Sequence, residues 1–153
     1  MKTRSATKTK YKFRVNKNMT NFYGFMHGGE LFKMMDTVAG ICTRNFCENP
    51  TLTRATNNLS YIAPSYIGDI ITVTAIIDHT GRTSMECFVE ARGENGDLRA
   101  SGYFTMVSVD ENKKSREIPS LILESEDDRR AFAMSEKRKA LYKEMASLKD
   151  RYE

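Results

Sequence analysis

Hydrophobic and polar positions in the first third of the chain predict a short strand, a polar loop and one long helix. The stretch YKFRV at residues 11–15 is typical of a strand, and the polar stretch NKNMTN that follows is typical of a loop. Over residues 28–46, apolar side chains recur every three or four positions, which predicts an amphipathic helix. Its apolar face comprises Leu31, Met34, Met35, Val38, Ala39, Ile41, Cys42 and Phe46, and its polar face comprises Lys33, Asp36, Thr37, Gly40, Thr43 and Arg44. We therefore expect the apolar face of this helix to lie in the core and its polar face to lie outside the core.

Four β-rich segments follow the predicted helix. They are residues 53–62, 70–79, 84–92 and 98–110. Turn-forming residues separate them, including Pro64 and Gly68 in APSYIGD and the Asn-Gly pair in GENGD. Such short connections favour an antiparallel meander. One long helix followed by four strands indicates an α+β layer in which the sheet covers the helix.

The two ends of the chain differ in composition from the middle. Residues 1–10 are read as a basic tail, which leaves residues 11–123 as the main domain. From Pro119 onward, acidic and basic residues cluster, and we predict a charged helix within residues 124–153. Its apolar residues at 4-3-4 spacing are Leu141, Met145, Leu148 and Tyr152. This spacing indicates a helix that lies on the body of the protein or on a partner.

Length and composition limit the class of protein. A chain of 153 residues is typical of one domain, and 40% hydrophobic with 29% charged residues is typical of a soluble globular protein. No apolar run approaches the roughly 20 residues that span a bilayer, so we expect no membrane span. The N-terminus lacks the apolar core of a secretory signal. We therefore expect the protein in the cytoplasm.

Charge and cysteine content add further expectations. The formal net charge of +4 suits an anionic ligand without selecting one, and no nucleic-acid-binding motif is visible, so we expect no nucleic-acid partner. The chain has an odd number of cysteines, Cys42, Cys47 and Cys87, without a C-x-x-C spacing, and it has only two histidines. The cysteines indicate neither a disulfide framework nor a metal site, and we interpret them as small buried apolar residues.

The candidate chemistry lies in NFYGFMHGGELFKMMD, residues 21–36. Gly28 and Gly29 occupy the start of the predicted helix, where the first N–H groups lack intrahelical partners. Glycine lets a ligand approach the backbone closely, so these N–H groups and the positive end of the helix dipole could stabilise an oxyanion. The same glycines also suit an ordinary helix start, and a lone Asp36 is also typical of a surface carboxylate.

The segment NFYGFMHGGELFKMMDTVAGI, residues 21–41, resembles the hotdog-fold acyl-CoA thioesterases, in the acyl-CoA hydrolase group that includes brain acyl-CoA hydrolase. Further matches follow in the same order along the chain. They are PSYIGD (64–69), TGRTSME (80–86), ASGYFTMVSVD (100–110), IP (118–119) and the tail ESEDDRRAF (124–132). The resemblance covers roughly residues 11–140, and the shared order of these motifs makes it more specific than any one of them.

This resemblance implies a fold, an assembly and an activity. The implied hotdog fold is a five- or six-stranded antiparallel sheet wrapped around the central helix, here with a C-terminal helix. Two subunits would join their sheets edge to edge, with active sites between them, commonly in trimers of dimers. Asp36 and Gly40 could then lie at the dimer seam. The implied reaction hydrolyses fatty acyl-CoA to free acid and CoA, and needs no cofactor because coenzyme A is part of the substrate.

The resemblance also implies roles for individual residues. Asp36 corresponds to the general base or nucleophile, and Asn21 would orient the attacking water in a site whose Asp36 comes from the other subunit. The N–H groups of Gly28 and Gly29 would bind the oxyanion. His27 could donate to the thioester carbonyl or simply shape the loop.

For CoA, the resemblance implies the turn around residues 81–84 and the basic tail. Arg82 would bind phosphate, while Thr83 and Ser84 offer hydroxyl groups. The tail candidates for the nucleotide 3′-phosphate are Arg129, Arg130, Lys137 and Arg138. Each of these side chains also suits a plain surface charge.

Two departures from the family pattern concern the loop and one strand. The family loop usually reads V-x-P-x-D-x-N; Val15 and Asn21 match it, but Lys17 replaces the proline and Met19 the acid. We therefore expect a looser loop around Asn21. Asn57 also stands where the family is often acidic.

Two alternative functions remain open at this stage. One is a hotdog dehydratase or hydratase acting on acyl-CoA or acyl carrier protein, because His27 with Asp36 could imitate its His–carboxylate pair. The other is a non-catalytic acyl-CoA-binding module, which an intact Asp36 disfavours.

Overall fold

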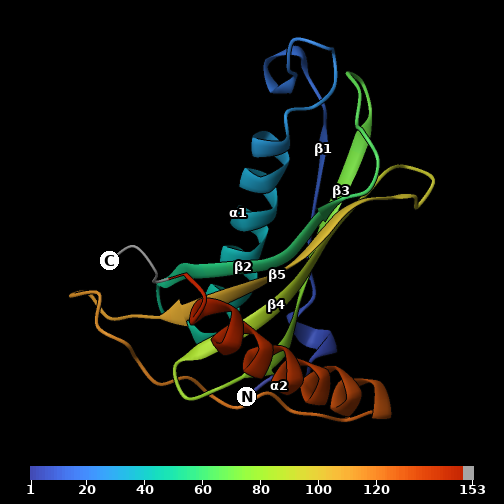
Figure 1. Cartoon of the computed structure of the whole chain (residues 1–153). Coiled ribbons are helices and arrows are strands. Elements are labelled where there is room, and N and C mark those ends of the chain that lie inside the picture. The colour runs from blue at the N-terminus through green and yellow to red at the C-terminus, as the bar shows by residue number, and fades with distance from the viewer. Residues whose placement is uncertain (150–153) are drawn as a thin grey trace.

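The computed structural model describes residues 1–149 and contains one five-stranded antiparallel sheet between two helices (Figure 1). The elements are a 3-10 turn Ser5–Thr7, β1 Thr9–Arg14, a 3-10 turn Lys17–Met19, α1 Gly28–Cys47, β2 Thr51–Tyr61, β3 Ile70–Thr80, β4 Ser84–Arg92, β5 Leu98–Ser108 and α2 Glu126–Ala146. The strand order is β1-β3-β4-β5-β2, so β1 and β2 are the edges. Of the four segments expected as a meander, β3, β4 and β5 follow that order, but β2 pairs with β5 and not with β3. The sheet with its central helix is the hotdog arrangement that the resemblance implied.

The central helix α1 packs its apolar stripe against one face of the sheet. It begins after His27, whose ring nitrogen accepts from the Gly29 N–H, and it ends at Cys47, before the cap residue Glu48 with its left-handed φ of 59°. The predicted polar residue Thr43 is buried, because its hydroxyl donates to the backbone oxygen of Ala39 at 2.9 Å. Two residues of the predicted apolar face, Met34 and Ile41, are only half-buried.

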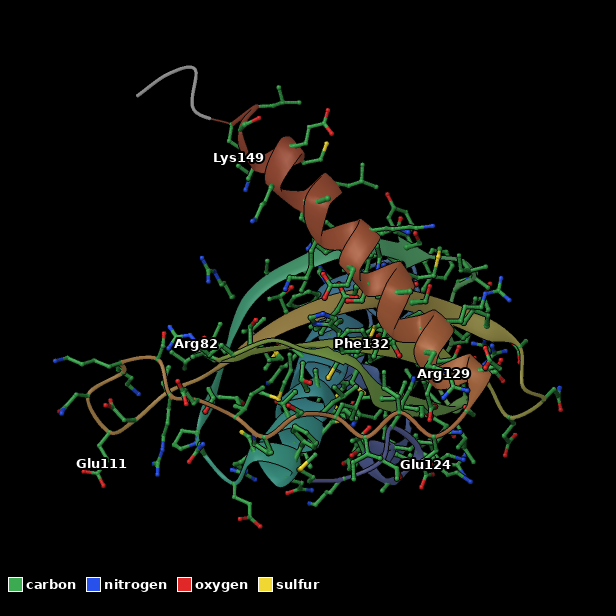
Figure 2. All side chains as sticks on the ribbon, turned by 90° about the horizontal axis from the view of Figure 1, so that it is seen from below. Arg82, Glu111, Glu124, Arg129, Phe132 and Lys149 are labelled. Atoms are coloured by element: carbon green, nitrogen blue, oxygen red, sulfur yellow. The ribbon has the colours of Figure 1, made fainter. Side chains whose placement is uncertain are left out.

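Alternation in the central strands builds the other side of the core. On β4, the alternating residues Met85, Cys87, Val89 and Ala91 are all buried in the core that they share with α1. Each packs beside its neighbour on β3 or β5. Glu86 belongs to the opposite set and is nevertheless buried at 4% exposure. The reason is that α2 crosses that face of the sheet (Figure 2).

The N-terminal segment, expected as a basic tail, packs on the body of the protein. Thr3 forms a bridge with Ile122, and the guanidinium of Arg4 binds the carboxylate of Asp78 at 2.8 Å. Thr7 is buried. Residues 1–10 therefore contribute to the packed structure, because a cation in this segment pairs with a buried carboxylate of β3.

The C-terminal helix α2 covers the face of the sheet opposite α1 (Figures 1 and 2). A capping box starts it: Ser125 accepts from the Asp128 N–H, and the Asp128 carboxylate accepts from the Ser125 N–H. Leu141 and Met145 remain exposed on its outer side. The helix ends at Ala146, and Tyr152, the last residue of the predicted apolar spacing, lies outside the described residues.

No helix within residues 1–149 is long and apolar enough to cross a membrane.

Candidate active site

The loop before α1 is folded by its own hydrogen bonds. The side-chain oxygen of Asn21 accepts from the Tyr23 N–H at 2.9 Å and from the Phe25 N–H at 3.3 Å. The His27 N–H donates to the backbone oxygen of Met19 at 2.7 Å. These bonds hold the loop without the family's proline and acid. Because both loop donors use the oxygen of Asn21, its amide nitrogen is the group left to contact a ligand.

The start of α1 offers one vacant backbone donor. The Gly29 N–H donates to Nδ1 of His27 at 3.0 Å, and the N–H groups of Glu30 and Leu31 donate to the backbone oxygen of His27. Within residues 1–149, no acceptor pairs with the Gly28 N–H. The sequence had suggested two bare N–H groups, and the structure leaves Gly28 as the vacant one. The His27 ring shapes the turn in this state.

An apolar cavity of about 300 Å³ opens beside this donor. Phe25, Leu31, Tyr61 and Ile62 line it, together with the backbone of Gly28. The Tyr61 ring lies so close that a side-chain carbon on Gly28 would be 3.4 Å from it. An acyl or pantetheine group bound in this cavity would be shielded from water. An N–H···O bond at the helix start is stronger in such a water-poor environment.

Asp36 lies on the half-buried side of α1, two turns after the glycines. Its carboxylate accepts from the hydroxyl of Thr53, a residue of the edge strand β2, at 2.5 Å. Thr53 could not be identified from the sequence, because one hydroxyl in an exposed edge strand leaves no periodic signal. Asp36 is eight residues after Gly28, which corresponds to about 12 Å along a helix. One carbonyl group cannot contact both residues of the same chain.

A second, open cavity of about 530 Å³ runs along the exposed side of α1. Gly40, Ile41 and Arg44 line it from the helix, and Pro50 and Thr51 line it from the start of β2. A side-chain carbon on Gly40 would have no neighbour within 4 Å. This side of α1 therefore has room for another chain beside the edge strand.

The turn before β4 lies far from the start of α1 within one chain. β3 begins at Ile70 near the loop before α1 and ends at Thr80, and its 11 residues correspond to about 33 Å. Arg82 is exposed and pairs with Glu117 at 3.3 Å. Thr83 contributes a backbone oxygen to the Ser108 N–H. A single chain therefore does not bring this turn to Gly28.

The basic residues of the tail divide into exposed and engaged ones. Arg129 pairs with Glu126 on the surface of α2, and Arg130 is exposed. Figure 2 shows Arg129 and Arg82 on opposite sides of the molecule, so one chain does not gather them around one ligand. Arg138 was a phosphate candidate, but its guanidinium binds buried Glu86 at 2.6 Å, because that carboxylate needs a countercharge.

No cluster of three or more metal-ligating side chains occurs in the described part of the chain. Cys42, Cys47 and Cys87 are buried free thiols, as the sequence suggested.

The sheet, the central helix and the glycine start of that helix define a hotdog-fold protein. The family model of the Thioesterase superfamily matches residues 23–100, and the chain belongs to this family. Protein VdlD of Helicobacter pylori is 32% identical over 144 residues, which cover 91% of this chain and 82% of that protein. The cytosolic acyl coenzyme A thioester hydrolase of Mus musculus is 32% identical over 117 residues, which cover 72% of this chain and 31% of that protein.

Solved structures agree with this assignment. An apo-hexameric acyl-CoA thioesterase superposes with a TM-score of 0.90 at 25% identity, covering 96% of this chain and 97% of that one. The acyl-CoA hydrolase of Staphylococcus aureus, solved in complex with butyryl coenzyme A, coenzyme A and coenzyme A disulfide, has a TM-score of 0.83 at 26% identity, with 95% and 94% covered. The family and fold predicted from the sequence are confirmed.

Proposed function

We propose that the protein hydrolyses acyl-CoA thioesters to a free acid and coenzyme A. The observation that carries this proposal is the vacant N–H of Gly28, a residue at the positive end of α1 that also lines an apolar cavity. A donor in this position matches the charge that develops on a thioester oxygen during attack. The names of the relatives support the same substrate class.

The reaction would use three groups. The thioester oxygen accepts from the Gly28 N–H, and Asp36 takes a proton from the water that attacks the carbonyl carbon. The amide of Asn21 orients this water. The C–S bond then breaks, coenzyme A leaves as a thiolate that gains the proton, and the free acid remains. No cofactor is needed, because the thioester itself carries coenzyme A.

The site would be shared between two subunits. Asp36 and Gly28 are about 12 Å apart along one helix, so a partner must supply one of them. The exposed edge strand β2 and the cavity beside Gly40 offer the surface for that partner. We infer a homodimer with joined sheets, assembled as a dimer or as a trimer of dimers. The hexameric state of one structural relative supports this assembly.

A shared site also explains how the residues proposed to bind coenzyme A could reach the substrate. Because Arg82, Thr83 and Ser84 lie far from Gly28 in their own chain, they would serve a site that another subunit completes. Arg129 and Arg130, which lie on α2, would bind the phosphates of the nucleotide. We further propose a cytoplasmic location, which the cytosolic mouse relative supports.

One observation weakens the alternative of a dehydratase or hydratase. Nδ1 of His27 already accepts from the Gly29 N–H, so this ring nitrogen is not available to pair with a carboxylate. The non-catalytic alternative predicts binding without release of thiol.

The decisive experiment measures free thiol released from a panel of short- to long-chain acyl-CoAs. We expect the wild-type protein to release thiol and the Asp36→Asn variant to release little. Both proteins should bind coenzyme A with equal affinity, as measured by calorimetry. A dehydratase or hydratase would instead change the absorbance of enoyl-CoA. Binding without any thiol release would contradict the proposed hydrolase.

The shared site has its own test. Asp36→Asn and Asn21→Ala proteins, each of low activity, would be unfolded together and refolded as mixed oligomers. Part of the activity should return, because some sites then contain both intact residues. Each variant refolded alone is the control, and an absence of recovery in proven mixed oligomers would place both residues in one subunit's site.

A further inference from the structure

The peptide unit between Gly28 and Gly29 is held on both sides. Its N–H donates to Nδ1 of His27 at 3.0 Å, and its C=O accepts from the hydroxyl of Tyr61 at 2.9 Å. A peptide unit is planar, so these two bonds together fix its rotation. The vacant Gly28 N–H belongs to the preceding peptide unit, whose carbonyl oxygen, that of His27, accepts from the N–H groups of Glu30 and Leu31. The two units meet at the α-carbon of Gly28, a residue that places few limits on its own backbone angles. Hydrogen bonds on both units therefore fix Gly28, and the one from Tyr61 ties it to another element of the fold.

Tyr61 is well placed to supply this restraint. It is the last residue of β2, 33 positions away from Gly28, and its ring both lines the 300 Å³ cavity and covers the glycine. Partial burial raises the pKa of Tyr61, so its hydroxyl stays protonated near neutral pH and can donate. A hydrogen bond from a different element couples the start of the helix to the edge strand.

We infer that Tyr61 is a positioning residue for thioester hydrolysis: its hydroxyl, bound to the Gly28 carbonyl, anchors Gly28 to β2 and so keeps the start of α1, with its vacant N–H, in place beside the cavity. This inference rests on the proposed function. The hydroxyl acts through Gly28 and does not itself contact the reacting atoms. Removing it should lower the rate of the chemical step more than substrate binding, because misaligned oxyanion donors weaken the transition state selectively.

The variant Tyr61→Phe tests the inference, since it keeps the ring over Gly28 and the cavity wall. We expect kcat to fall by about tenfold, below the ~100-fold or more for loss of a whole oxyanion donor, with KM changed less than about twofold. The midpoint of thermal unfolding should stay within about 2 °C, the scale of a lost surface hydrogen bond.

The matched control is Tyr11→Phe. Tyr11 is also half-exposed, stacks on Phe13 and lies on β1, the sheet edge opposite β2. This change should leave both kinetic constants as in the wild type. An active wild type with unchanged kcat in Tyr61→Phe would overturn the inference, as would a loss of kcat that follows a loss of folded protein. A wild type inactive on every acyl-CoA would reject the proposed function itself.

A double-mutant comparison tests whether the two bonds act on one peptide. His27→Ala removes the ring that accepts from the Gly29 N–H, and Tyr61→Phe removes the donor to the Gly28 carbonyl. If both restrain the same unit, the combined loss of kcat should be smaller than the product of the single losses. Losses that multiply fully would mean that the residues act independently, which contradicts the shared restraint.

Discussion

The start of α1 and the layer beneath α2 use polar groups in opposite ways. Beneath α2, Arg138 binds Glu86 at 2.6 Å and Arg4 binds Asp78 at 2.8 Å, with both carboxylates at least nine-tenths buried. At the start of α1, the Gly28 N–H is vacant in the described chain. The comparison teaches that polar groups paired within the chain hold elements together, whereas a donor left open is available to a ligand.

The layer beneath α2 joins three parts of the chain. Arg4 belongs to the N-terminal segment, Asp78 to β3 and Arg138 to α2. Burial raises the pKa of Asp78, although its bonds with Arg4 oppose that effect. The guanidinium of Arg138 also stacks over the ring of Tyr103 at 3.9 Å. These contacts explain why α2 and the N-terminal segment both adhere to the outer face of the sheet.

The largest expected effect is on stability, from Arg138→Ala. It would leave Glu86 buried without its countercharge, at a cost of about 3 kcal/mol in the free energy of unfolding. Denaturation with urea measures this loss. The exposed neighbour change Lys137→Ala should cost less than about 0.5 kcal/mol. Equal stability of the two variants would show that the buried pair does not hold α2 on the sheet.

Asp36→Asn should show the reverse pattern, with loss of rate and retained stability. Replacing the carboxylate should lower kcat at least about a hundredfold, because the amide cannot accept the proton of the attacking water. It can still accept from Thr53, so unfolding should change little. Asn21→Ala should cost less than Asp36→Asn, since it removes only orientation. The control Glu48→Gln changes an exposed carboxylate at the other end of α1. Near wild-type turnover in Asp36→Asn would leave the mechanism without its base.

A smaller effect should follow from the capping residue Asp128. The N–H groups of Glu124 and Ser125 donate to this carboxylate and hold its pKa below the usual range. A lowered folded pKa stabilises the protein above the unfolded value of about 3.9, and that contribution is lost as pH falls through the folded pKa. Asp128→Asn should therefore cost about 1 kcal/mol at pH 7.

The measurement for Asp128 is urea unfolding of wild type and variant across pH. The difference between them should begin to shrink below about pH 4, where the carboxyl of the unfolded chain takes up a proton, and should be lost as the pH falls through the lower pKa of the folded state. Asp127→Asn, an exposed change in the same helical turn, should show a smaller difference at pH 7. A difference that is constant down to pH 2 would mean that the charge of Asp128 is unimportant.

The smallest expected effect concerns Arg82, which lies outside both the start of α1 and the layer beneath α2. Arg82→Ala should raise KM for acyl-CoA a few fold and leave kcat nearly unchanged, because a remote phosphate contact acts equally in ground and transition states. Glu117→Gln is the matched control: it frees Arg82 from its exposed pair and should not raise KM. A fall in kcat alone would assign Arg82 another role.

Most residues of the candidate site could be proposed from the sequence because they lie close together along the chain. Asn21, His27, Gly28, Gly29 and Asp36 lie within 16 residues, and one loop and one helix place them. The contacts that complete the site are distant along the chain. Thr53 reaches Asp36 across 17 positions and Tyr61 reaches Gly28 across 33. Neither hydroxyl has a sequence signal, because β-bulges interrupt the alternation of β2.

The sequence by itself determined the helix, the central strands and the family. Periodicity of 3.6 and 2 depends only on neighbouring residues, so α1 and the buried set of β4 follow from it. Tertiary structure alone decided that Glu86 is buried, that Arg138 pairs with it across 52 positions and that Arg4 reaches Asp78 across 74. The physical reason is that burial of a charge depends on which element covers it. That choice follows from packing of the whole chain, since a carboxylate enters the interior only where a distant cation meets it.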